Sequence, residues 1–221
     1  MTKLKATLVG FTQPCINVPA SGPEDFIAFC ARVSSDRPRE EWGKRYDKLL
    51  SYCFRHKHFS VFEMVDAVVE IEAPRDISRQ LLRHRSFCFQ EFSQRYSDKI
   101  EFTDRDWRHQ DRKNRQNSLD TLTMEDTWEA NDYMESVLKS SGYSYERLRE
   151  MDIAKECARV ILPEGLTISK LFMKGSMRSW MTYLETRLDP TTQKEHRDLA
   201  QKIKECLLPV FPTIFNLEKD K

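Results

Sequence analysis

The sequence has few glycines and no long apolar run. Its six glycines among 221 residues form neither a G-x-G-x-x-G turn nor a Walker loop. A bound dinucleotide would therefore have to be held by arginine side chains and helix ends. No apolar stretch approaches the ~20 residues of a membrane span, and residues 1–14 lack the basic start and long apolar core of a secretory leader. We therefore expect a cytoplasmic location and no membrane partner.

Excess charge and paired cysteines are also missing. The 36 basic and 35 acidic residues nearly cancel, whereas nucleic-acid-binding proteins usually carry a basic excess, so no nucleic-acid partner is expected. The six cysteines form no CxxC pair, which fits a reducing compartment better than a disulfide framework. His56, His58 and Glu63 lie close in sequence, but no further ligand at metal-binding spacing accompanies them, and no metal site is predicted.

Hydrophobic spacing predicts an α+β fold, and the length suits one domain spanning residues 1–221. Short apolar or alternating segments predict strands at 3–11, 65–71 and 167–173. Helical spacing predicts one helix opening at Pro74 and others over about 21–34, 40–55, 124–139, 145–162, 175–187 and 192–208. Residues 98–125 are strongly polar, and we interpret them as an exposed insertion and a candidate lid, although such runs are more often merely solvated.

One stretch, residues 83–97, concentrates groups that could carry chemistry. It reads RHRSFCFQEFSQRYS, with three arginines and one histidine among four aromatic rings and one carboxylate. Guanidinium groups suit phosphate and carboxylate oxygens, and aromatic rings can pack against a base or a flavin. Composition alone leaves an exposed arginine-rich turn equally open, because cations at 83–85 also complement the C-terminal dipole of the preceding helix.

The order of these residues resembles the signature of the flavin-dependent thymidylate synthases, Arg-His-Arg-x-x-Ser-x-Asn-Glu-x-Ser-x-Arg-Tyr. The matching positions are Arg83, His84, Arg85, Glu91, Ser93, Arg95 and Tyr96. Cys88 and Gln90 replace the usual Ser and Asn, and the wording around Gln90 is similar to that of a viral branch of the family. Shorter similarities follow in the family's order at 31–34, 58–63, 159–163, 176–187 and 193–195. Ser176 stands where the family usually has Asn, and Thr182 stands where it usually has His or Asn.

The resemblance implies a role for each matching residue. Those implied to surround dUMP are Gln80, Arg83, Glu91, Ser93, Gln94, Arg95, Arg159 and Arg187. Those implied to face FAD are Ser34, His58, Ser60, Glu63, Arg83, His84, Arg85, Gln90, Glu91, Ser176, Arg178 and Thr182. Arg187 is the implied catalytic residue, because a fixed cation beside the pyrimidine favours ionised N3 and pushes electron density toward the attacking carbon.

The implied reaction is the reductive methylation of dUMP to dTMP, with FAD as cofactor and NADPH and methylenetetrahydrofolate as co-substrates. The implied architecture is an α+β single domain with a mixed or antiparallel sheet flanked by helices. It would assemble as a homotetramer with sites shared between subunits, in the cytoplasm (that of an infected host cell for a viral member). Three alternatives stay open: a flavin- and folate-dependent nucleotide hydroxymethylase, a non-catalytic phosphate-binding module, and a hydrolase using His84 and Glu91 as acid and base.

Cys88 is the most tempting nucleophile in the chain. A thiol near Arg85 could ionise more easily than usual, and thiolates are good nucleophiles. Its neighbours Phe87 and Phe89 are apolar, however, and apolar surroundings keep a thiol neutral. We therefore interpret Cys88 as structural.

Overall fold

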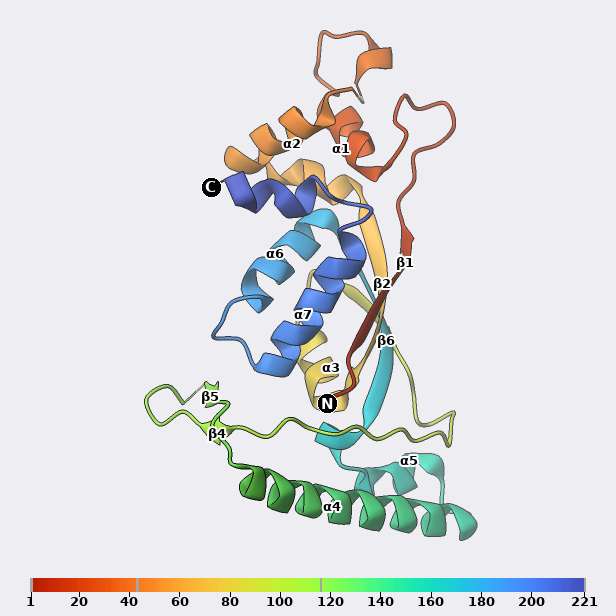
Figure 1. Ribbon diagram of the computed structural model, residues 1–221. Helices are drawn as coiled ribbons and strands as arrows, with labels where there is room; N and C mark the ends of the chain where they lie inside the picture. Colours follow the sequence, from red (N-terminus) through yellow and green to blue (C-terminus); the bar gives the residue numbers. More distant parts are fainter. Residues whose placement is uncertain (1, 43, 116, 221) are drawn as a thin grey trace.

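An antiparallel sheet of four strands, ordered β1-β2-β6-β3, organises the chain in the computed structural model, which describes residues 2–42, 44–115 and 117–220 (Figure 1). The strands are β1 (Lys5–Phe11), β2 (Asp66–Pro74), β3 (Cys88–Glu91) and β6 (Ile168–Ser176). Each of the three pairings between them is antiparallel. The prediction of an α+β fold with a mixed or antiparallel sheet is confirmed in its antiparallel form.

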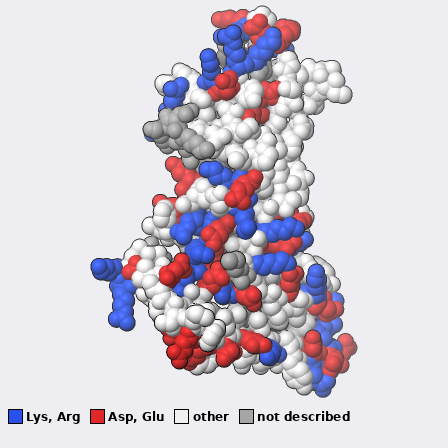
Figure 2. Space-filling view, in the orientation of Figure 1, with Lys and Arg blue, Asp and Glu red and all other residues white. Residues whose placement is uncertain are grey.

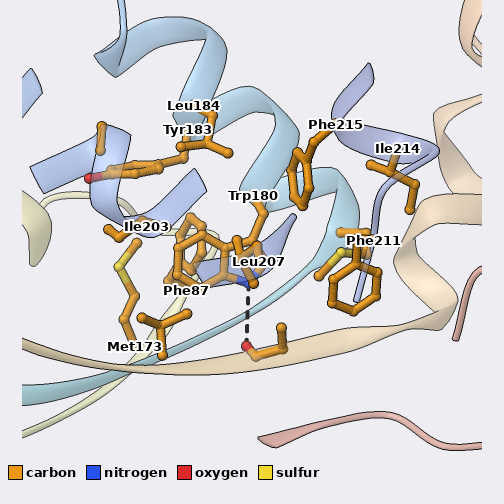
Figure 3. Packing of buried hydrophobic residues seen from close by; sticks show 14 of the residues in the cluster. Phe87, Met173, Trp180, Tyr183, Leu184, Ile203, Leu207, Phe211, Ile214 and Phe215 are labelled. Atoms are coloured by element: carbon orange, nitrogen blue, oxygen red, sulfur yellow. Dashed lines mark hydrogen bonds between the residues drawn. The ribbon is translucent and has the colours of Figure 1, made fainter. Parts of the chain in front are cut away.

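One face of the sheet carries the hydrophobic core. Along β2 the side chains of Ala67, Val69 and Ile71 are fully buried, while the residues between them are only half-buried, as the two-residue period of a strand requires. Helices α6 (Met177–Arg187) and α7 (Lys194–Leu207) cover this face (Figure 1). Trp180 of α6 lies against the sheet, and its Nε1–H donates to the Ala67 carbonyl at 3.3 Å (Figure 3).

The remaining helices differ from the sequence predictions in two places. The structure has α1 (Pro23–Ala31), α2 (Tyr46–Arg55), α3 (Arg75–Leu81), α4 (Met124–Glu150) and α5 (Lys155–Ala158). The helix predicted over 40–55 begins only at Tyr46, because Arg45 has φ 51° and this left-handed residue stops α2 from extending backwards, and Arg39–Glu41 forms a separate 3-10 turn.

The second error lies in α4. The sequence predicts two helices over 124–139 and 145–162, but α4 runs without a break to Glu150. The second predicted helix then stops, because Asp152 is left-handed with φ 58°, and only the short α5 follows. A glycine costs an exposed helix only ~1 kcal/mol, and Gly142 faces the Phe102 ring, 3.5 Å from where its Cβ would stand. Ser141 turns its hydroxyl back onto the Val137 carbonyl at 2.7 Å. The weak helix propensity of this one glycine is therefore not enough to end the helix.

The described residues of the polar segment 98–125 do not form a freely exposed loop. Gln116 lies outside the described residues. Phe102 forms a β-bridge with Thr167, and the backbone N–H of Thr103 donates to the Leu166 carbonyl at 3.0 Å. The two-residue strands β4 (His109–Gln110) and β5 (Ser118–Leu119) pair with each other. The Arg108 side chain is only 11% exposed. The prediction of exposure is wrong at Thr103 and Arg108, while a role as a lid stays a prediction.

Gly175 is required by close packing under the Phe87 ring. A Cβ placed on Gly175 would stand 2.5 Å from Phe87 Cδ1, well inside van der Waals contact. That ring is buried against Trp180, with 4.7 Å between ring centroids, and has little freedom to move.

We expect Gly175→Ala to lower the free energy of unfolding by about 1–3 kcal/mol through overpacking. Gly10→Ala is the matched control, since its Cβ would meet Val68 at an ordinary 4.0 Å. Chemical denaturation of both variants checks this, and equal stability of the two would contradict the packing argument.

Candidate functional site

The Arg-His-Arg segment forms a tight turn between α3 and the edge strand β3. The backbone N–H of His84 donates to the Leu81 carbonyl at 2.9 Å, and that of Phe87 donates to the His84 carbonyl at 3.3 Å. The Ser179 hydroxyl, from the first turn of α6, donates to the Ser86 carbonyl at 3.1 Å. The turn is therefore fixed from both sides. β3 was missed by sequence reasoning, because four residues are too few to display an alternating pattern.

Arg187 reaches this turn from the far end of α6. Its Nε–H donates to Nε2 of His84 at 3.0 Å, across 103 residues of sequence. The His84 ring also meets Tyr183 edge to face, with 5.0 Å between centroids. Burial, together with the positive charges of Arg187 and Arg83, lowers the pKa of His84. His84 is therefore a neutral imidazole whose Nε2 accepts and whose Nδ1 carries the proton.

Gln80 lies beside this pair, on α3. Its carboxamide is held by Gln193, at 2.8 Å, and by a fully buried histidine, His196, whose Nδ1 lies 3.0 Å from Gln80 Oε1. Sequence reasoning missed His196. The signal was available, because His196 shares an apolar helix face with Leu199 and Ile203, where a polar side chain needs a partner.

A second set of cations gathers at the start of α3. Arg75, which sequence reasoning also missed, donates to Gln94 Oε1 at 2.5 Å. Burial lowers the pKa of Arg75, the Glu91 carboxylate counteracts this, and the positive charges of Arg79 and Arg159 lower it further. A cation in the first turn of a helix opposes the helix dipole, and this unfavourable placement was the signal in the sequence.

The end of β3 and the segment after it are tied to the same region. Glu91 Oε1 accepts from the Ser169 hydroxyl at 2.8 Å, and Arg95 forms an ion pair with Glu156 at 3.3 Å. Ser93 accepts from the backbone N–H of Arg95 at 3.3 Å, which closes a local turn. Glu91 and His84 are each bonded to a different partner, so no acid–base pair between them is evident in the contacts of the described chain.

A third cluster lies at the other end of β6. The Ser176 hydroxyl donates to Glu63 Oε2 at 2.6 Å, and Arg178 forms an ion pair with Glu63 Oε1 at 3.1 Å. Ser176 is also the N-cap of α6 and accepts from the Ser179 backbone N–H at 3.3 Å. The serine that replaces the family's usual asparagine thus both starts the helix and fixes the carboxylate.

The other predicted flavin residues are exposed. Ser60 lines an open, mostly apolar groove of ≈ 700 Å³ beside Phe29, Trp42 and Val61. His58 lies against Tyr52, with 5.9 Å between ring centroids. The remaining exposed residues of this set are Ser34, Arg83, Arg85, Gln90 and Thr182.

The Glu91 and Glu63 contacts lie at opposite ends of β6. Ser169, which bonds Glu91, and Ser176, which bonds Glu63, are seven residues apart on β6, or roughly 23 Å at the rise of a strand. The described contacts therefore place the predicted residues in distinct groups along and beside β6.

Cys88 is exposed, contrary to the expectation of an apolar setting. Strand alternation sends Phe89 toward the core beside Met173, while Cys88 pairs with Lys174 on the opposite, open face of the sheet. The thiol is therefore directed away from the face that bears the core.

We expect Cys88→Ser to keep most of the enzyme's turnover, because the thiol lies on the open face and its replacement needs no repacking. A steady-state assay of the folded, flavin-loaded variant checks this. Abolished turnover would make Cys88 catalytic.

Acidic and basic side chains are interspersed on the face of the molecule seen in Figure 2, and they do not form one broad field of a single sign. Over the ranges 2–42, 44–115 and 117–220, no group of three or more His, Cys, Asp or Glu side chains lies where it could hold a metal ion. Within the same ranges, none of the helices is both long enough and apolar enough to pass through a bilayer.

The comparisons with known proteins first define a class. Residues 18–213 match the family model described as thymidylate synthase complementing protein. The solved structure of a UMP/dUMP methylase from Streptomyces cacaoi, bound with 5-Br dUMP, has the same fold. It gives a TM-score of 0.83 and covers 100% of this chain and 96% of that one. Its sequence identity is 22%, so this likeness concerns the fold alone.

Two relatives then define the family. The flavin-dependent thymidylate synthase of Synechocystis sp. is 46% identical over 208 residues, which cover 93% of this chain and 95% of the relative. A protein of Paramecium bursaria Chlorella virus 1, named "Probable flavin-dependent thymidylate synthase", is 43% identical over 96% of this chain and 97% of its own length. The chain belongs to the flavin-dependent thymidylate synthase family, as its Arg-His-Arg motif indicated.

Proposed function

We propose that this protein reductively methylates dUMP to dTMP, with methylenetetrahydrofolate as carbon donor, NADPH as reductant and FAD as cofactor. The observation that carries the proposal is the 3.0 Å bond from Arg187 to His84. It joins the two motifs of the family, 103 residues apart, at one point. A guanidinium held there by one edge keeps its other N–H groups free for a pyrimidine.

The nucleotide's phosphate would be bound by the cations at the start of α3. Arg75, Arg79 and Arg159 are close enough for the charges of the latter two to lower the pKa of Arg75. Such mutual repulsion is relieved by a dianion, which a phosphate monoester supplies. Gln80 and Arg187 would then contact the base. Glu91, Ser93, Gln94 and Arg95, as the resemblance implies, would complete the nucleotide site.

The chemistry of the third cluster fits a flavin dinucleotide. Glu63, Ser176 and Arg178 offer one carboxylate, one hydroxyl and one cation beside the motif turn, and the groove at Ser60 is apolar enough to pack a ring. When bound, the flavin supplies the reducing hydride. The chain's own residues bind and orient the nucleotide, and Arg187 stabilises negative charge that develops on the pyrimidine.

We also propose that the enzyme is a homotetramer with sites shared between subunits. The roughly 23 Å between the Glu91 and Glu63 contacts along β6 supports this, because a second subunit would bring complementary residues to each of them. Residues 98–125 remain a proposed lid. All six cysteines are free, which fits a reducing cytoplasm.

Arg83 provides a test of the shared site. The family motif assigns it to both dUMP and FAD, and its side chain is exposed to solvent, where a ligand can reach it. We expect Arg83→Ala to weaken both affinities about tenfold, since a hydrogen bond to a charged group contributes ~1.5–3 kcal/mol. Titration of each ligand checks this, with the exposed Lys202→Ala as control. Two unchanged affinities would leave Arg83 only a role at the end of α3.

The experiment that tests the proposal is the visible absorbance of purified protein before and after addition of dUMP. We expect the spectrum of bound oxidised flavin, changed by dUMP. Protein that takes up no flavin would favour the phosphate-binding module, and release of phosphate from dUMP without folate would favour the hydrolase.

A further inference from the structure

A line of hydrogen bonds runs from the insertion to Gln80 through the start of α7. Arg108 Nη2 donates to Glu195 Oε1 at 2.6 Å, and Gln193 Nε2 donates to Glu195 Oε2 at 3.0 Å. Gln80 Nε2 donates to Gln193 Oε1 at 2.8 Å, and Gln80 Oε1 lies 3.0 Å from His196 Nδ1. Each side chain in this line is bonded to the next.

The ionised carboxylate fixes the direction of every bond in the line. Burial raises the pKa of Glu195, but hydrogen bonds from Arg108, its own backbone and Gln193 outweigh burial, so the pKa stays below its ordinary value. A carboxylate can only accept, so Gln193 must turn its NH₂ toward Glu195 and its carbonyl oxygen toward Gln80. Gln80 in turn gives an N–H to Gln193 and is left with its oxygen facing His196.

His196 must therefore donate through Nδ1. Burial, with the positive charge of Arg187, lowers its pKa to about 3, so the ring is neutral and carries one proton. That proton lies on Nδ1, because the facing atom of Gln80 is an acceptor. Gln80 keeps one N–H and one lone pair uncommitted, and its side chain is only half-buried.

We infer that His196 is a positioning residue that orients the Gln80 carboxamide toward the base of the nucleotide. The inference rests on the proposed function for the identity of that nucleotide. His196 and Gln193 hold opposite sides of the same amide. Exchange of its O and N would break the bond to Gln193, whose direction Glu195 fixes, and would force the His196 proton from Nδ1 to Nε2. A fixed donor and a fixed acceptor are what a uracil edge, with its carbonyl oxygens and N3, requires.

Packing alone does not explain a histidine at this position. His196 is 0% exposed, on the helix face that carries Leu199 and Ile203. Its Nε2 has no hydrogen-bond partner among the described residues, so its burial carries a desolvation cost that an apolar side chain would avoid. Its ring also packs near His84 and Tyr183, and the hydrogen bond to Gln80 is the polar contact through which we infer that the imidazole acts on the site.

Two variants of nearly equal size separate positioning from packing. Asparagine in place of His196 can present an N–H close to where Nδ1 donates, whereas leucine has a similar shape and no donor. We expect His196→Asn to bind dUMP within about threefold of wild type, and His196→Leu to bind it about three- to tenfold more weakly, the equivalent of one neutral hydrogen bond. Melting temperatures should not follow this order, because leucine suits a buried site at least as well as asparagine.

The dUMP affinity is read from the change in flavin absorbance, and an unaltered flavin spectrum in both variants shows that the cofactor site is intact. In a Gln80→Ala background the difference between the H196N and H196L proteins should vanish, since the two side chains then have no amide to orient. Equal dUMP affinity of H196N and H196L, or a difference that persists without Gln80, would overturn the inference.

A further variant keeps the test decisive if H196L does not fold. Gln193→Met removes the other hold on the same amide and must also weaken dUMP binding about three- to tenfold; unchanged binding would overturn the inference. The proposed function fails separately, because a wild-type spectrum insensitive to dUMP would reject that function. A sensitive spectrum with equal variants would reject only the role of His196.

Discussion

Replacing Arg187 with lysine is expected to lower the rate of dTMP formation at least about tenfold while flavin remains bound. Arg187 donates through Nε to His84, and the other edge of its planar fork is what we assign to the pyrimidine. Lysine has a point charge with no fork and cannot serve both partners. Loss of one charge-assisted hydrogen bond is worth roughly 1.5–3 kcal/mol, and every ~1.4 kcal/mol is a factor of ten in rate.

Steady-state turnover with saturating dUMP, together with a flavin titration, measures this effect. Arg197→Lys is the matched control, because Arg197 lies on the adjacent helix α7 and donates to the Pro190 carbonyl at 2.8 Å, outside the proposed site. An R187K enzyme within about threefold of wild type would remove Arg187 from the chemistry.

The second large effect concerns stability, at Arg108. Its side chain and that of Glu195 are 11% and 5% exposed, so the pair is buried between the insertion and α7. Removing one partner of a buried ion pair leaves an uncompensated charge and typically costs about 3–5 kcal/mol. We therefore expect Arg108→Met to lower the free energy of unfolding by about that amount, measured by chemical denaturation at pH 7.

Two controls isolate the buried charge. Arg147→Met breaks an exposed pair with Glu150 and should change stability by less than about 1 kcal/mol. Adding Glu195→Leu to Arg108→Met removes the unpaired carboxylate and should restore much of the loss. A double variant as unstable as the single one would contradict the ion-pair account.

The pH dependence follows from the same pair. The pKa of Glu195 is depressed in the folded protein, from an ordinary value of 4.5. Its contribution to stability is therefore complete above that value and is lost as pH falls through the lower folded pKa. Without Arg108, burial would raise the pKa of Glu195 instead. Protonation at low pH would then remove the unpaired buried charge and reduce the loss of stability in the variant. The difference in stability between wild type and R108M should narrow as pH falls from 7 toward 4.

Much of the fold was predictable from periodicity. The alternation of Val65–Ile71 and the apolar faces of the later helices gave the strands and the cover of the sheet close to their observed places. The errors arose where tertiary contacts decide. Arg45 adopts a left-handed conformation that its sequence does not signal, and Gly142 stays helical within the 27-residue α4.

The site was predictable only as a set of residues. The family motifs named Glu63 and Glu91, but their separation along β6 depends on strand register, which a motif does not contain. His196 and Arg75 lie outside the motif. Both stand where their chemistry is locally unfavourable, one on an apolar helix face and one at a helix N-terminus. A search for such misplaced polar residues would have found them.

The product formed from dUMP tests the central claim most directly. Purified protein would be incubated with dUMP, methylenetetrahydrofolate, NADPH and FAD, and the nucleotides separated and analysed by mass spectrometry. We predict dTMP, heavier than dUMP by one CH₂, formed only when folate and reductant are both present. A hydroxymethylated nucleotide, deoxyuridine released by loss of the phosphate, or unchanged dUMP with bound flavin would each contradict the proposed function.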